Sequence, residues 1–220
     1  MILMKRNCLK YVGAVLVSAV VSMSMPSLTQ AQDKKEEKKD DKKPSDADMM
    51  NMMMELAKPG ENHKLLQSGV GTWSYTVKWW MSPDAPPNTS TGTTVARAVM
   101  DGRYVITDHT GKMQMPGADG KMMDMEFKGM AVEGYDNVKK KFVSSWIDNM
   151  GTAIMISEGT YDAGTKTLTY TAETELMPGM KTKMRQVIKL ADKDHRTMEF
   201  FETRGGTEVK TMEISYTRKS

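Results

Sequence analysis

The chain has 220 residues, of which 31 are Lys or Arg, 28 are Asp or Glu, 24 are Met and one is Cys. Lys5, Arg6 and Lys10 lie in a first segment without acidic residues, so the rest of the chain is close to neutral. A neutral chain lacks the basic field that nucleic-acid binding needs, and we expect no nucleic-acid partner. Because Cys8 lies in the same segment, the rest of the chain has no disulfide and no zinc–thiolate site.

Residues 1–31 are predicted to be a secretory signal peptide. The basic head precedes an apolar run, Tyr11–Val21, and small residues lead to a cleavage site near Ala31. The apolar run is much shorter than the roughly 20 residues of a spanning helix. We therefore expect a periplasmic or secreted protein with no membrane span after cleavage; an uncleaved membrane anchor is the alternative.

Two short segments separate the signal peptide from the main domain. Residues 32–45 mix Lys with Asp and Glu and contain no large apolar residue, which is typical of a disordered charged linker. Residues 46–67 are predicted to be a short helical segment. Asp46 and Asp48 precede a Met-rich run, Met49–Ala57, and Pro59-Gly60 ends it.

Residues 69–219 are predicted to form one domain of β-strands. Apolar and polar residues alternate from Gly71 onward, as in a half-buried antiparallel strand. Similar runs follow at about 91–100, 103–110, 123–134, 141–149, 153–161, 167–174, 182–191, 195–203 and 208–218. Tight turns between them favour an all-β fold, a single antiparallel up-and-down β-barrel of about ten strands, over a β-sandwich, because closure removes exposed edges.

The first and last strands suggest how the barrel is closed. Gly71-x-Trp73 opens the first strand and Arg218 ends the last. This pattern resembles the lipocalin and fatty-acid-binding superfamily, in which a tryptophan after a glycine packs beneath a basic residue of the final strand. The resemblance implies structural roles for Gly71, Trp73 and Arg218.

A longer series of motifs resembles the domain-of-unknown-function 1579 (DUF1579) family. The resemblance implies a bacterial, exported or soluble single domain with a calycin-like barrel, and it implies no activity and no catalytic residue. It covers nearly all of residues 60–219. The motifs are Gly71-Thr72-Trp73, Trp79-Trp80-Met81-x-Pro83, Asp101-Gly102-Arg103-Tyr104, Gly134-Tyr135-Asp136-Asn137, Trp146–Thr152, Glu158–Asp162 and Met212–Arg218.

A barrel of this size is wide enough to hold a small ligand, and several side chains are candidates to line it. Trp79, Tyr104 and Trp146 are the aromatic candidates. Asp148 follows Trp146 on the same face of its strand. A buried carboxylate needs a partner, for which Arg103 and Arg185 are candidates. The competing interpretation is that Asp148 begins a turn.

Enzyme motifs are absent from the sequence. It has no nucleophile elbow, no zinc-protease motif and no phosphate-binding glycine loop, so we predict no catalytic residue. His63, His109 and His195 are expected at the surface or in turns. His109 is placed at a strand end, where a histidine at a barrel mouth would ligate haem or act as a base.

Methionine is unusually frequent, with clusters at Met49–Met54, Met113-Gln114-Met115, Met122–Met125 and Met177–Met184. Thioethers bind Cu(I), and they also form an adaptable apolar lining. We favour core or cavity lining and predict no metal site and no cofactor.

The function predicted is non-catalytic binding of a small apolar or amphipathic molecule by an exported barrel. Three alternatives remain: an enzyme that uses a carboxylate or histidine in the cavity, copper binding by methionine, and a filled barrel with a purely structural role. The sequence leaves the ligand and the oligomeric state open.

Overall fold

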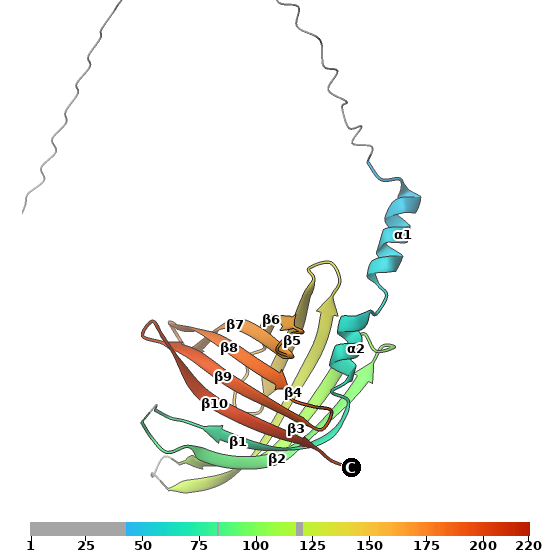
Figure 1. Cartoon of the computed structure of the whole chain (residues 1–220). Coiled ribbons are helices and arrows are strands. Elements are labelled where there is room, and N and C mark those ends of the chain that lie inside the picture. Colours follow the sequence, from blue (N-terminus) through green and yellow to red (C-terminus); the bar gives the residue numbers. More distant parts are fainter. Residues whose placement is uncertain (1–42, 83, 118–120) are drawn as a thin grey trace, which may run out of the picture. The chain divides into compact units, whose positions relative to one another are not determined.

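The computed structural model describes residues 43–82, 84–117 and 121–220 (Figure 1). The predicted signal peptide and residues 32–42 of the predicted linker lie outside the described residues. Within the described residues, two helices precede ten strands.

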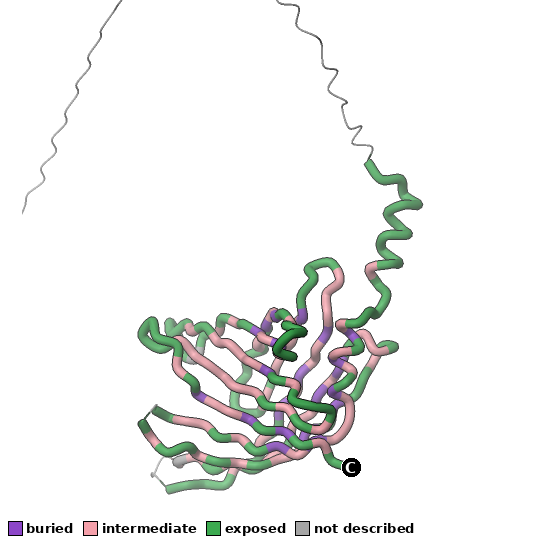
Figure 2. The backbone as a smooth tube through the Cα atoms, viewed as in Figure 1, coloured by how far each residue is buried: buried purple, intermediate pink, exposed green. Residues whose placement is uncertain are grey.

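The first helix is α1, Asp46–Leu56, and it is fixed at its start by a capping box. The Ser45 side chain accepts a hydrogen bond from the Asp48 N–H, and the Asp48 carboxylate accepts one from the Ser45 N–H. No residue of α1 is buried, as the exposed tube in Figure 2 shows. The second helix is α2, Glu61–Gln67, and it contacts β3 and β4 of the barrel.

The ten strands form a closed antiparallel barrel in which each strand pairs with its neighbours in sequence and β1 pairs with β10. This confirms the predicted up-and-down barrel. The strands are β1 (Gly71–Trp79), β2 (Asn88–Val99), β3 (Tyr104–Pro116), β4 (Met122–Asp136), β5 (Lys141–Asp148), β6 (Met155–Asp162), β7 (Thr167–Met177), β8 (Met180–Leu190), β9 (His195–Arg204) and β10 (Thr207–Arg218).

The up-and-down topology gives the barrel two distinct ends. One end, called the closed end here, carries α2, the start of β1 and the turns after β2, β4, β6 and β8 (Figure 1). The opposite end, called the mouth, carries the turns after β1, β3, β5, β7 and β9.

The closed end holds the larger of the two hydrophobic clusters. Leu66 of α2 packs with buried side chains that project from strands of the barrel, which are Ala96, Val105, Phe142, Leu168, Tyr170 and Ile188. Figure 2 shows buried positions distributed along the strands. Helix α2 therefore closes that end of the barrel with apolar side chains. The interior nearer the mouth is lined by other residues.

Candidate functional site: an internal cavity

A cavity of about 530 Å³ occupies the interior of the barrel. All ten strands contribute to its wall, and Leu65, Leu66 and Gly69 close it at the α2 end. Met150 and Gly151, which are exposed in the turn after β5, also line it, so the cavity reaches the mouth. Its volume lies within the roughly 300–1,000 Å³ typical of small-molecule sites.

Aromatic side chains of the wall lie against glycines of neighbouring strands, and this keeps the interior open. A Cβ at Gly129 would lie 2.5 Å from the Trp146 ring, and a Cβ at Gly111 would lie 2.5 Å from the Tyr75 hydroxyl. Tyr170, which is buried and does not itself line the cavity, lies in the same way against Gly159. Because these glycines have no side chain, the rings occupy the space beside the backbone instead of the centre of the barrel.

The deep part of the cavity holds charged groups. Arg196 projects from the start of β9, near the closed end, and its guanidinium carbon lies 3.9 Å from the centroid of the Trp73 ring. Glu133 of β4 also lines the cavity, and the Tyr170 hydroxyl donates a hydrogen bond to its Oε1 at 3.4 Å. Burial raises the pKa of Glu133, while the charge of Arg196 and the bond from Tyr170 act in the opposite direction.

Arg196 itself is held in an unfavourable electrostatic environment. Burial and the nearby positive charge of Arg218 both lower the pKa of Arg196, and Glu133 opposes them. An arginine stays protonated at any physiological pH, so the charge is retained inside the barrel.

His109 lies in the middle of the cavity wall. Its Nδ1 is 2.9 Å from Oγ1 of Thr94, its partner in register on β2, and its ring lies 5.2 Å from the centroid of Trp146 in an edge-on arrangement. Burial lowers the pKa of His109 to about 4, although the nearby Asp108 carboxylate favours the charged form. The imidazole is therefore neutral at pH 7.

Trp146 and Asp148 lie on the cavity wall toward the mouth. The Trp146 Nε1–H donates to Asp148 Oδ2 at 2.7 Å, and the Met150 N–H donates to Asp148 Oδ1 at 2.9 Å. Asp148 thus both faces the cavity and begins the turn after β5. It is satisfied by these two donors and not by Arg103 or Arg185.

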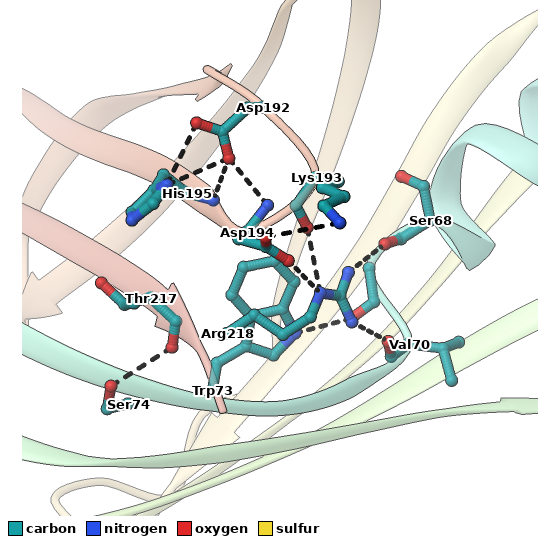
Figure 3. Close-up of polar contacts among 11 residues, drawn as sticks. Ser68, Val70, Trp73, Ser74, Asp192, Lys193, Asp194, His195, Thr217 and Arg218 are labelled. Atoms are coloured by element: carbon teal, nitrogen blue, oxygen red, sulfur yellow. Dashed lines mark hydrogen bonds and ion pairs between the residues drawn. The ribbon is translucent and has the colours of Figure 1, made fainter. Parts of the chain in front are cut away.

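The floor of the cavity is a tightly bonded cluster around Trp73 (Figure 3). The Arg218 guanidinium lies 4.1 Å from the Trp73 ring centroid and donates hydrogen bonds to the carbonyl groups of Val70, Ser68 and Lys193 at 2.6, 2.8 and 2.9 Å. The Trp73 Nε1–H donates to the Gly69 carbonyl at 2.9 Å.

Gly71 fits this floor for two reasons. Its φ of +130° is rarely adopted by other residues, and a Cβ there would lie 2.6 Å from Arg218 Nη1.

Of the seven candidate ligand-binding residues, the structure brings three to the cavity: Trp146, Asp148 and His109. Trp79 is half-buried at the mouth end of β1 and is not part of the wall. Tyr104 faces outward, because it alternates with the inward Val105, and its ring covers Gly134 on the outer surface.

The two arginine candidates also lie outside the cavity. Arg103 is in the turn before β3, where its Nε–H donates to the carbonyl of Ala57 after α1. Arg185 is on the outer face of β8 and forms a bidentate ion pair with Glu208, at 2.8 and 2.6 Å.

Two histidines are less exposed than the sequence predicts. His63 is 5% exposed in α2, where its Nδ1 accepts a hydrogen bond from the Gly60 N–H at 3.0 Å. His109 lies within β3, which continues to Pro116, and not at a strand end. His195 is exposed, as predicted, and is the first residue of β9, where its Nδ1 lies 3.0 Å from Asp192 Oδ1 in the preceding turn. Tertiary packing of α2 and the long β2–β3 hairpin accounts for both differences.

Two groups of methionines differ in their surroundings. Six line the cavity: Met113, Met150, Met155, Met184, Met198 and Met212. Those of α1 are exposed, from 39% at Met49 to 66% at Met53. Among the described residues, no three His, Cys, Asp or Glu side chains gather as a metal site.

Arg196 and Glu133 were not among the candidates from sequence, although an alternation signal was present. Arg196 has the same phase along its strand as Met198 and Phe200, and Glu133 has the same phase as Ala131 and Tyr135. A charged residue in phase with apolar ones indicates an inward position. For Arg196 this pattern was missed because the preceding residues, Asp194 and His195, were interpreted as a turn.

Comparison with solved structures finds similar barrels in two proteins of very different sequence. Rv2717c from M. tuberculosis is 15% identical, with a TM-score of 0.52, over 74% of this chain and all of the other. The S-type phycobiliprotein lyase CPES from Guillardia theta is 10% identical, with a TM-score of 0.50, over 72% of this chain and 93% of the other. At these identities the likeness shows the fold alone.

A comparison with curated proteins gives no match. None of the helices in the described part of the chain has the length and hydropathy of a membrane span.

A family model matches residues 58–218, a stretch that contains the whole barrel, α2 and the floor cluster around Trp73. The family is described as "Protein of unknown function (DUF1579)". The sequence motifs, the closed barrel and this match agree, and the chain belongs to the DUF1579 family.

Proposed function

We propose that this protein binds a small amphipathic molecule inside its barrel and performs no chemistry on it. The observation that carries the proposal is the cavity of about 530 Å³, which is open to solvent at the mouth and lined mainly by apolar and aromatic side chains. A domain with a purely structural role would fill this space, since protein interiors are normally packed without large voids.

The lining supports a binding role in its details. Glycines opposite the aromatic rings hold the interior open, and six methionines provide an apolar surface that adapts to the shape of a guest. Polar side chains of the wall, among them Arg196, Glu133 and His109, would orient that guest, as in other small-molecule sites. One structurally similar barrel is named a phycobiliprotein lyase, and this is compatible with a ligand-holding role.

Export is the second part of the proposal. The basic head, the apolar run and the small-residue exit of residues 1–31 support a cleaved signal peptide and a periplasmic or secreted location. N-terminal sequencing of the protein recovered from the producing cells tests this, with cleavage expected near Ala31. An intact Met1 in the mature protein would contradict it.

Native mass spectrometry of the protein purified without added ligand tests the binding role. We expect a retained organic mass that is lost on denaturation, because an apolar cavity of this size holds water poorly and keeps a well-fitted guest during purification. A protein of exact apo mass that also fails to take up apolar fluorescent probes would contradict the proposal. Bound copper would instead support the methionine alternative.

A further inference from the structure

The guanidinium of Arg196 has no hydrogen-bond acceptor within the described part of the chain. Its Nε is buried without a partner, and no hydrogen bond of its Nη atoms is formed. Its contact with the protein is the face of the Trp73 ring, at 3.9 Å. A buried N–H without an acceptor is costly, since it gives up its hydration and gains no hydrogen bond in exchange. The Arg196 donors are therefore available to something that enters the cavity.

A second donor lies directly beside Arg196. Tyr216 of β10 is its partner in register, and both side chains point into the barrel. The Tyr216 hydroxyl also has no hydrogen-bond partner among the described residues. Its neighbour Tyr75 differs, because that hydroxyl donates to the Thr110 carbonyl at 3.2 Å.

Glu133 does not neutralise Arg196. The two groups influence each other electrostatically but form no ion pair within 4 Å, and the carboxyl group of Glu133 is bonded to Tyr170. Burial raises the pKa of Glu133, and an anion bound at Arg196 would raise it further, because a second negative charge nearby disfavours the carboxylate.

Much of the cavity wall toward the mouth is apolar, and the two carboxylates there, Asp148 and Glu202, already accept hydrogen bonds from Trp146 and Arg204. Met198 and Phe200 follow Arg196 on the same face of β9, and Met212 and Trp146 line the wall nearer the mouth. A guest that satisfies Arg196 at the closed end thus has its remaining length against thioether and aromatic surface.

We propose that Arg196 and Tyr216 bind the carboxylate of an amphipathic acid, such as a fatty acid, whose apolar tail extends toward the mouth. The planar fork of a guanidinium matches a carboxylate with two parallel hydrogen bonds, and the Tyr216 hydroxyl supplies a further donor. This inference rests on the proposed binding function and names the class of ligand.

The test compares two probes that differ only in the head group. Binding of cis-parinaric acid and of the corresponding alcohol is measured by fluorescence at neutral pH, with the full chain, Arg196→Met, Tyr216→Phe and the control Arg97→Met. Arg97 is on the outer face of β2, with its side chain 52% exposed, so its replacement removes the same charge without changing the cavity. Circular dichroism establishes that each variant is folded.

We expect the unsubstituted protein and Arg97→Met to prefer the acid to the alcohol by at least about tenfold, the value of a charged hydrogen-bonded pair. Arg196→Met removes that preference and leaves the affinity for the alcohol within about threefold. Tyr216→Phe keeps the ring in place and weakens only the binding of the acid, by about threefold to tenfold. It therefore tests the site even if Arg196→Met does not fold.

Equal binding of acid and alcohol by the unsubstituted protein, or a preference that survives in Arg196→Met, would overturn the assignment of the head group and leave the binding function intact. Failure of both probes to bind any folded form would overturn the binding function as well.

Discussion

The floor of the barrel and the cavity above it each place an arginine against Trp73, and the two are held very differently. Arg218, at the floor, donates three hydrogen bonds to backbone carbonyl groups at 2.6 to 2.9 Å and has the Asp194 carboxylate 3.5 Å away. Arg196, in the cavity, stacks on the same ring at nearly the same distance and has no acceptor among the described residues.

This difference in hydrogen bonding indicates a structural role for Arg218 and a binding role for Arg196. Arg218 donates to carbonyl groups of the segment after α2 and of the turn after β8. These hydrogen bonds connect the end of β10 to the start of β1. Arg196 ties nothing together, because its hydrogen-bonding capacity is directed at an open space. Both arginines contact the Trp73 ring, so this contact does not distinguish their roles. The roles differ because the N–H donors of Arg218 have acceptors and those of Arg196 have none among the described residues.

If Arg218 is the structural member of the pair, its removal has the largest effect on stability. We expect Arg218→Met to lower the free energy of unfolding by about 2–4 kcal/mol, because three backbone carbonyl groups lose their donor and the Trp73 ring is uncovered. Urea denaturation measures this. Arg97→Met is the matched control, with an expected change below about 0.5 kcal/mol, and an equal loss in both variants would contradict the structural role.

The cavity wall is also expected to make stability dependent on pH through His109. A folded-state pKa of about 4, below the ordinary 6.5, means that the unfolded chain binds the proton more readily, so stability falls as the pH decreases from about 6.5 to 4. The loss amounts to about 3.4 kcal/mol at most, because each unit of pKa difference is worth about 1.4 kcal/mol.

The measurement for His109 is the difference between the unsubstituted protein and His109→Asn in denaturant titrations across that pH range, in which contributions of other groups such as Glu133 cancel. We expect the curves to converge as the pH falls. Parallel curves would show that the imidazole is not enclosed.

The glycines opposite the aromatic rings test whether the cavity is held open by close packing at its wall. A methyl group at Gly129 would lie 2.5 Å from the Trp146 ring, so we expect Gly129→Ala to cost about 1–3 kcal/mol or to push the ring into the cavity and weaken probe binding. Gly151→Ala is the control, because nothing lies within 4 Å of a Cβ there. Equal behaviour of the two variants would contradict this account of the wall.

The smallest effect on stability is expected at Arg196. Its stacking on Trp73 contributes favourably, but the burial of its Nε without an acceptor is costly. Arg196→Met should therefore change the free energy of unfolding by no more than about 1 kcal/mol in either direction. Thermal and urea denaturation check this beside Arg218→Met. A loss as large as that of Arg218→Met would remove the distinction between the two arginines.

The fold was largely predictable from local patterns. Strand alternation and turn residues placed all ten strands, with the largest shortfall at β3, which continues from Tyr104 to Pro116 beyond the expected end at residue 110. The candidate site was predictable only in part. Trp146, Asp148 and His109 lie on the cavity wall, whereas Tyr104 faces outward and Arg103 and Arg185 lie outside the cavity.

The sequence by itself determined the all-β character and the strand order, because period-two alternation and turn chemistry are local signals. The packing of Trp73 against Arg218 was expected from the resemblance to the lipocalin and fatty-acid-binding superfamily. Only the tertiary structure decided which face of each strand is inward, which glycine lies beneath which ring, and which arginine has acceptors. Those properties depend on register between strands far apart in the chain, as when Tyr216 is set beside Arg196. The unpaired donors of Arg196 exist only once the barrel has closed around them.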